Sequence, residues 1–180
     1  IILQGDSGLG KTMFLRYHVL RVTSICVYLT AERCTNGVMH AIRAKLLGAA
    51  RDETFLKTLI YAGALDVFID GVNEVSPDTR AEIAKFMEEL FKGNFIVTTQ
   101  RLSWSANRVG TVVELAPLKK DQILEYLLGR YSTLDQPEVS HSEYRDACSD
   151  FVESVHAAKT VDPALRTLLS NPMDLSIAAQ

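Results

Sequence analysis

The chain has 180 residues, of which 47% are apolar, and it carries a formal net charge of −3. This length and composition suit a folded domain with a hydrophobic core of its own. The acidic balance argues against a general nucleic-acid-binding or membrane surface, because such surfaces are usually basic. Nucleic acid is therefore not indicated as a partner.

Targeting features are missing from the sequence. No apolar stretch approaches the roughly 18 residues that a membrane-spanning helix needs. The three cysteines contain no C-x-x-C pair, so neither a zinc site nor a disulfide framework is indicated. We expect a reducing, cytoplasmic setting. Because the chain begins at Ile1, directly in an expected strand, we also expect it to be a piece of a longer protein with both ends truncated.

Segments typical of strands and helices alternate over the first part of the chain. Short apolar strands are expected at 1–4, 25–29, 67–70, 95–99 and 111–115. Helices are expected at 11–20, 38–47 and 53–61, and from Ser76 to the Gly93-Asn94 pair. This alternation predicts an α/β fold in which a parallel sheet has helices on both faces.

After Pro117 only helices are expected. One apolar stripe runs from Ile123 to Tyr131, Ser140 and Glu143 have the spacing of a capping box, and Asp162-Pro163 and Asn171-Pro172 are typical helix starts. We therefore expect two domains, an α/β domain over 1–131 and a helical subdomain over 132–180, with their boundary in the loop around 132–139.

The segment between the first strand and the first helix matches the P-loop pattern G-x-x-x-x-G-K-[ST]. Its glycines let backbone N–H groups surround a phosphate, and the helix that follows adds positive potential at its N-terminus. Lys11 is expected to reach the β- and γ-phosphates, and the Thr12 hydroxyl to ligate Mg²⁺. The expected nucleotide-binding residues are Gly5, Asp6, Ser7, Gly8, Leu9, Gly10, Lys11, Thr12 and Met13.

A P-loop ATPase also needs a carboxylate near the metal, usually at the end of a neighbouring buried strand. Asp70 ends such a strand, and we expect it to bind the metal; the alternative is that it only caps the strand. Glu74 follows four residues later and is a candidate to polarise the attacking water, or else is an exposed loop residue. Asn73 could orient water or metal by hydrogen bonds.

Polar residues also end the strand at 95–99. Ligands of parallel sheets lie beyond the carboxyl ends of the strands, so Thr99 and Arg101 are expected to face the phosphates. Arg101 could sense or stabilise charge on the γ-phosphate, and the alternative is a surface arginine.

Together these segments resemble the NACHT family of signal-transducing P-loop ATPases, part of the AAA+-related STAND class. The resemblance rests on Gly5–Thr12, on Phe68–Glu74 with the small Gly71 directly after the metal-binding aspartate, and on Val97–Arg101. Leu115-Ala116-Pro117-Leu118 and Asn171-Pro172 also look like family segments. Asn73 and Gln100 depart from the residues often found there, which weakens the expectation of efficient hydrolysis.

The resemblance implies a three-layer fold with a five-stranded parallel sheet in the order 5-1-4-3-2, followed by a small helical subdomain. It implies binding of ATP or ADP with Mg²⁺, slow hydrolysis, and Pro172 near the adenine. It also implies a nucleotide-dependent switch that forms a homo-oligomer in the ATP state, with winged-helix, sensor and effector domains elsewhere in the same chain.

Two other functions fit a P-loop ATPase site. One is a motor of the AAA+ type that remodels protein or nucleic-acid complexes, although no pore loop or DNA-facing loop is identifiable in the sequence. The other is a P-loop kinase, against which the absence of an arginine-rich acceptor lid argues.

Overall fold

The computed structural model describes residues 1–46, 52–90, 92–101, 110–133, 139–157 and 163–178. They divide into two compact units, Ile1–Leu115 (unit 1) and Ala116–Gln180 (unit 2). This division replaces the expected boundary at 131/132. The physical reason is the helix α5 (Lys120–Arg130), whose Ile123 and Leu127 share a buried core with Cys148 and Val152 of the next helix.

Unit 1 contains a five-stranded sheet in which all pairs of neighbouring strands are parallel. Its strands are β1 (Ile2–Gln4), β2 (Ile25–Thr30), β3 (Leu65–Asp70), β4 (Phe95–Thr99) and β5 (Val112–Glu114). They lie in the order β2-β3-β4-β1-β5, which from the β5 edge is the order 5-1-4-3-2 that the resemblance implies. The predicted α/β class with a parallel sheet is confirmed.

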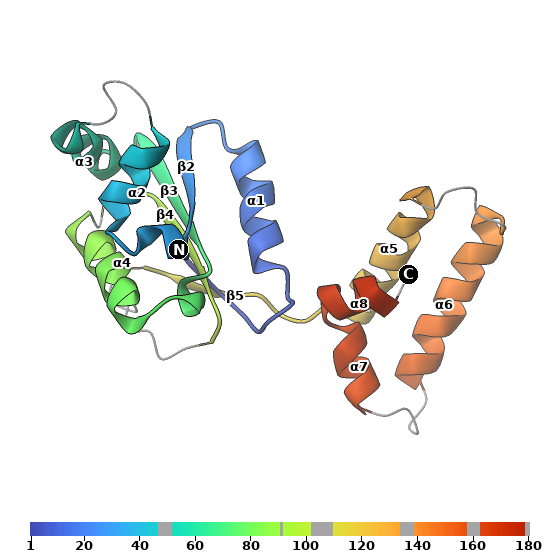
Figure 1. Ribbon diagram of the computed structural model, residues 1–180. Coiled ribbons are helices and arrows are strands. Elements are labelled where there is room, and N and C mark those ends of the chain that lie inside the picture. Colours follow the sequence, from blue (N-terminus) through green and yellow to red (C-terminus); the bar gives the residue numbers. More distant parts are fainter. Residues whose placement is uncertain (47–51, 91, 102–109, 134–138, 158–162, 179–180) are drawn as a thin grey trace. The chain divides into compact units, whose positions relative to one another are not determined.

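Helices cover both faces of this sheet (Figure 1). The helix α1 (Lys11–Arg21) lies on one face, and the helices on the other face are α2 (Val38–Lys45), α3 (Glu53–Tyr61) and α4 (Pro77–Glu89). The expected end of α2 at Leu47 lies outside the described residues.

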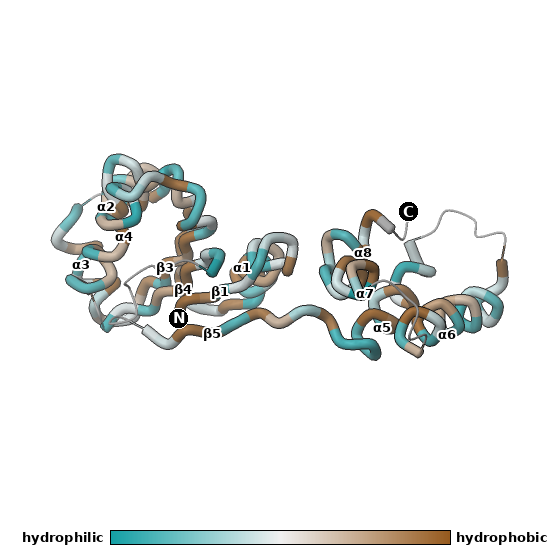
Figure 2. The backbone as a smooth tube through the Cα atoms, turned by 90° about the horizontal axis from the view of Figure 1, so that it is seen from below, coloured by the Kyte–Doolittle hydropathy of each residue, from teal (hydrophilic) through white to brown (hydrophobic). Residues whose placement is uncertain are grey.

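The central strands β3 and β4 carry apolar side chains on both faces because both of their faces are covered. Figure 2 shows this as hydrophobic colouring along β3 and β4. Val67 and Ile69 belong to the main core with residues of α2, α3 and α4. Phe68 points to the opposite face, where its ring lies edge-on to His18 of α1 with 5.7 Å between the ring centroids. Because both faces of β3 contact helices, Val67, Phe68 and Ile69 form one continuous apolar run in the sequence.

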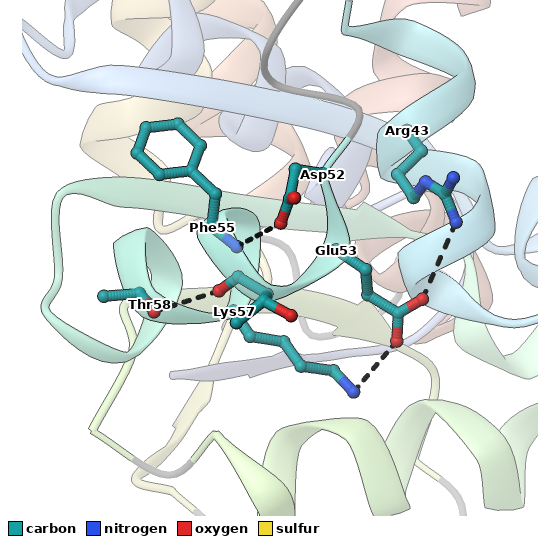
Figure 3. Close-up of polar contacts among 7 residues, drawn as sticks. Arg43, Asp52, Glu53, Phe55, Lys57 and Thr58 are labelled. Atoms are coloured by element: carbon teal, nitrogen blue, oxygen red, sulfur yellow. Dashed lines mark hydrogen bonds and ion pairs between the residues drawn. The ribbon is translucent and has the colours of Figure 1, made fainter.

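Helix α3 begins with a side-chain cap. The Asp52 carboxylate accepts a hydrogen bond from the N–H of Phe55 at 2.8 Å (Figure 3). Glu53 in the first turn pairs with Lys57 at 2.9 Å and with Arg43 of α2 at 3.6 Å. The cap and the acidic first turn both favour helix initiation at the predicted residue.

Unit 2 is helical in its described residues, as predicted. After α5 come α6 (His141–Ala157), α7 (Pro163–Leu169) and α8 (Pro172–Ala178). The predicted capping box is present, since Glu143 accepts from the Ser140 N–H at 2.9 Å and the Ser140 hydroxyl accepts from the Glu143 N–H at 3.3 Å. Asp162, the expected cap of α7, lies outside the described residues. None of the helices described in either unit is long and apolar enough to cross a membrane.

Candidate functional site

The loop between β1 and α1 has the backbone geometry that a phosphate loop requires. Gly10, directly before α1, has a φ of +86°, a left-handed conformation that side chains other than glycine adopt only with strain. Gly5 packs so tightly that a Cβ there would come within 3.2 Å of the Leu115 carbonyl oxygen. The loop therefore places the first N–H groups of α1, which have no partner within the helix, at the carboxyl end of β1.

Lys11 folds back over this loop. Its Nζ donates to the carbonyl oxygens of Gly5 at 2.8 Å and Asp6 at 2.7 Å. Partial burial lowers the pKa of Lys11, and the charges of Asp6, Asp70 and Glu74 oppose that shift. The charges of all three carboxylates therefore act on the Lys11 ammonium group. The sequence analysis implied this for Asp70 and Glu74, because it assigned them to the metal and the attacking water beside Lys11.

Asp70 lies at the end of β3, where 8% of its surface is exposed, and it meets the P-loop helix directly. Its Oδ1 accepts a hydrogen bond from the Thr12 hydroxyl at 3.1 Å. A hydroxyl and a carboxylate side by side are hard oxygen donors of the kind that Mg²⁺ prefers, and phosphate oxygens normally complete such a site. Among the described residues, no group of three or more His, Cys, Asp or Glu side chains is placed to hold a metal ion.

Two further hydroxyl groups hold the Asp70 carboxylate, and sequence reasoning missed both. Thr98 donates to Oδ1 at 2.5 Å, and Tyr28 of β2 donates to Oδ2 at 2.8 Å. Burial raises the pKa of Tyr28 and Asp70 raises it further, while a hydrogen bond from Arg16 opposes the shift. A tyrosine phenol is protonated at neutral pH even at its ordinary pKa of about 10, so Tyr28 is the donor in this bond.

Strand pairing explains why these residues meet. Tyr28 pairs with Phe68 and Thr30 with Asp70, while Ile96 pairs with Phe68. Side chains alternate between faces along a strand, so positions 28, 68, 70, 96 and 98 all face α1. Thr99 faces the other side, where it is 2% exposed and its hydroxyl has no hydrogen-bond partner among the described residues. The expectation that Thr99 faces the phosphates is therefore not supported, and Thr98 is the threonine that contacts the site.

The turn after Asp70 brings Glu74 back toward the P-loop. Gly71 has a φ of +78°, so the turn needs glycine for its conformation, and the Glu74 carboxylate lies over it, with Oε2 2.9 Å from where a Cβ would be. The short helix Val72–Glu74 follows. The Asn73 side-chain oxygen accepts from the Gln100 N–H at 3.0 Å, which ties this turn to the end of β4. That bond gives Asn73 a structural role, and a contact of Asn73 with water or metal stays a prediction.

Arg101 lies beside the P-loop, between two carboxylates. Its Nε is 2.6 Å from Glu114 at the end of β5 and 3.8 Å from Asp6. All three side chains are more than half exposed, which limits what each pair contributes to stability. Sequence analysis named Arg101 and Asp6 but missed Glu114.

Two further predicted residues, Met13 and Pro172, are less informative. Met13 is 67% exposed on α1 and follows Thr12 directly. Pro172 begins α8 in unit 2, where the Asn171 side-chain oxygen accepts from the Met173 N–H at 3.0 Å. This is the ordinary cap of a helix start. A contact of Pro172 with the adenine stays a prediction.

The sequence matches no protein-family model and no curated protein. Among solved structures, the chain is similar to a RuvB mutant from Thermotoga maritima, with 14% identity and a TM-score of 0.51 over 93% of this chain and 60% of that one. It is also similar to a Pif1 helicase from a study of DNA unwinding at forked DNA, with 15% identity and a TM-score of 0.38 over 72% of this chain and 43% of that one. The chain thus spans less than two thirds of either protein. The likeness to RuvB, together with the sheet order and the P-loop, shows a P-loop NTPase fold.

Proposed function

We propose that this chain binds ATP with Mg²⁺ at the P-loop and hydrolyses it slowly. The observation that carries the proposal is the 3.1 Å hydrogen bond from Thr12 to Asp70, which joins the residue after the P-loop lysine to a buried carboxylate on a neighbouring strand. A P-loop that was only a glycine turn would need no carboxylate at this point.

Each residue has a defined task in this proposal. The N–H groups of the P-loop and the Lys11 ammonium bind the phosphates, and Thr12 with Asp70 holds the magnesium ion. When bound, Mg²⁺ would neutralise charge on the phosphate oxygens. Glu74 accepts a proton from, or orients, the attacking water. Arg101 interacts with the γ-phosphate once a nucleotide competes with Glu114 for its guanidinium group.

Nucleotide affinity tests the binding step. Lys11→Ala removes a cation and its charge-assisted hydrogen bonds, and we expect ATP affinity to fall about tenfold to a hundredfold. Lys85→Ala is the matched control, because Lys85 is exposed on α4. Isothermal titration calorimetry with ATP and Mg²⁺ measures both variants, and unchanged affinity in Lys11→Ala would refute the proposed site.

Steady-state hydrolysis tests the role of Glu74. Glu74→Gln keeps the size of the side chain but removes the base, so turnover should fall about a hundredfold or more while ATP affinity stays close to that of the wild type. Glu88→Gln, at an exposed position of α4, is the control. Equal turnover in Glu74→Gln and Glu88→Gln would remove Glu74 from the mechanism.

At a finer level, we propose a NACHT-like signalling switch, in which ATP and ADP favour different arrangements of the chain and the ATP form assembles into a homo-oligomer. What supports it is the resemblance in sequence at Gly71, at Val97–Arg101 and at the segments after the sheet, together with Arg101 beside the P-loop. A group that contacts only the γ-phosphate can distinguish the two nucleotides and so bias a two-state element.

A motor of the AAA+ type is the second candidate. The likeness to RuvB supports it, because that match extends over 93% of the chain and so includes most of unit 2. Assays of turnover and assembly on the full-length protein distinguish the two candidates. Slow turnover with ATP-dependent assembly, measured by light scattering on a size-exclusion column, favours the switch. Fast turnover stimulated by DNA or unfolded protein favours the motor.

A further inference from the structure

Tyr28 has no part in the phosphate-binding loop, yet its hydroxyl contacts the carboxylate that we assign to the metal. It lies on β2, an edge strand, and donates to Asp70 Oδ2 at 2.8 Å. The two threonine hydroxyls on the same carboxylate, from Thr12 and Thr98, both donate to the other oxygen, Oδ1. Tyr28 is therefore the only donor to Oδ2 among the side-chain contacts of the described residues.

The way these donors are divided between the two oxygens determines how freely the Asp70 carboxylate can rotate. The terminal torsion of an aspartate side chain is broad, so a carboxylate is not held by rotamer preference alone. Two donors on one oxygen fix the position of that oxygen but leave the carboxylate able to turn about it. A third donor on the second oxygen removes this freedom, and Tyr28 supplies it.

Tyr28 is itself held from α1. Arg16 acts on the Tyr28 phenol by opposing the rise in its pKa, and Arg16 follows Thr12 by four residues, so the two side chains lie on the same face of the helix. One helix thus contacts the carboxylate twice, directly through Thr12 and indirectly through Arg16 and Tyr28. Lys45 at the end of α2 adds a second cation, 5.8 Å from the centroid of the Tyr28 ring.

We infer that Tyr28 is a positioning residue for the magnesium site, which fixes the orientation of the Asp70 carboxylate toward Thr12 before metal and nucleotide bind. This inference rests on the proposed function, and it deepens that proposal by adding a residue from β2 to the site. It predicts that Tyr28 contributes to the part of nucleotide affinity that depends on Mg²⁺ and not to the part that is independent of it.

The test is the Mg²⁺ enhancement of binding, defined as ATP affinity in excess Mg²⁺ divided by ATP affinity in EDTA. Tyr28→Phe removes one oxygen atom and keeps the ring. We expect the enhancement to fall about tenfold or more, which is the lower end of the range for one hydrogen bond to a charged group, while the affinity in EDTA changes less than about twofold. Tyr17→Phe is the matched control, since Tyr17 lies on α1 with 55% of its surface exposed.

Two further variants show whether the effect passes through Asp70. In Asp70→Asn the carboxylate is absent, so adding Tyr28→Phe should produce no additional loss of enhancement. Arg16→Gln weakens the support of the phenol without changing β2, and we expect it to reduce the enhancement in the same direction by a smaller factor.

The outcomes are distinct. An enhancement in Tyr28→Phe equal to that of the wild type overturns the inference, and so does an equal loss of affinity in Mg²⁺ and in EDTA, because Tyr28 would then support the fold and not the metal site. In both cases the proposed function stands if Lys11→Ala still abolishes tight binding. A wild-type chain that binds no nucleotide overturns the proposed function and this inference together.

Discussion

Thr98 offers the sharpest test of how the site is built into the sheet. Its hydroxyl donates to Asp70 Oδ1 at 2.5 Å and accepts from the Gly71 N–H at 2.8 Å, and the residue is 1% exposed. Thr98→Val keeps the shape but removes both hydrogen bonds. The bond to a carboxylate is worth about 1.5–3 kcal/mol, and a buried N–H without a partner costs about 1–3 kcal/mol. We expect the free energy of unfolding of unit 1 to fall by about 3 kcal/mol.

Thr98→Ser is the control, because it keeps the hydroxyl and loses one buried methyl group, at a cost of about 1 kcal/mol. The two variants should therefore differ by about 2 kcal/mol, which is about 1 M in the urea midpoint for a slope of about 2 kcal/mol per M. Denaturant-dependent hydrogen exchange, read on peptides from β3 and β4, separates unit 1 from unit 2. If Thr98→Val is as stable as Thr98→Ser, the hydroxyl bridge does not stabilise the fold and this reasoning is refuted.

Three other predictions follow from single contacts. Glu114→Gln removes the nearest carboxylate from Arg101, so the ratio of ATP to ADP affinity should rise by about twofold to fivefold. The factor is modest because both side chains are over half exposed, and an unchanged ratio by calorimetry would contradict the prediction. Burial raises the pKa of Cys34 to about 11, so about one thiol in a thousand is ionised at pH 8. Iodoacetamide should therefore modify Cys34 only after the chain is unfolded in urea, which mass spectrometry can detect. Hydrogen bonds from the Ser140 hydroxyl and N–H lower the pKa of Glu143, so this capping contact stabilises α6 at pH values above the ordinary glutamate pKa and is lost as the pH falls through the lowered pKa. An NMR titration of Ser140→Ala should show the pKa of Glu143 moving back up.

The sequence predicted those parts of the molecule that local chemistry determines. A P-loop needs its glycines, lysine and threonine at fixed spacing, so Gly10, Lys11 and Thr12 were identifiable without knowledge of the fold. Asp70 was identifiable because a P-loop ATPase needs a carboxylate near the metal, and Asp70 directly follows the apolar run Val67–Ile69. The strands themselves were predictable because strands buried on both faces are continuously apolar.

Contacts that depend on strand parity were not predictable in the same way. Thr98 and Thr99 are adjacent and chemically identical, and only the register of β4 against β3 shows which of them faces α1. Tyr28 was hidden for the same reason, since its contact with Asp70 requires β2 to pair with β3 in one particular register. The strand order was implied by the resemblance, but the order does not show which of two adjacent residues faces α1, so the choice between Thr98 and Thr99 required the register.

The boundary between the units was missed for a different reason. The loop around 132–139 is polar and separates two helices, which is typical of a domain linker. The side chains on either side of it nevertheless pack together, because Ile123 and Leu127 of α5 share a core with Val152 of α6. The two compact units meet in the chain at Leu115/Ala116, directly after the last strand of the sheet.

The contacts of α1 lead to a last prediction about how the site communicates with the rest of the sheet. Thr12 donates a hydrogen bond to Asp70 of β3, and Arg16 on the same helix lowers the pKa of Tyr28 on the edge strand β2 and so lies close to its phenol. Because both side chains belong to one helix, a nucleotide that fixes the N-terminus of α1 should also restrain β2. We therefore expect hydrogen exchange of a peptide covering 25–30 to slow when ATP and Mg²⁺ are added, although β2 contributes nothing to the P-loop. In Tyr28→Phe the same ligand should still slow exchange in a peptide covering 5–16 but should no longer slow it in β2. Slowing of both peptides in Tyr28→Phe would show that β2 is restrained by the sheet alone.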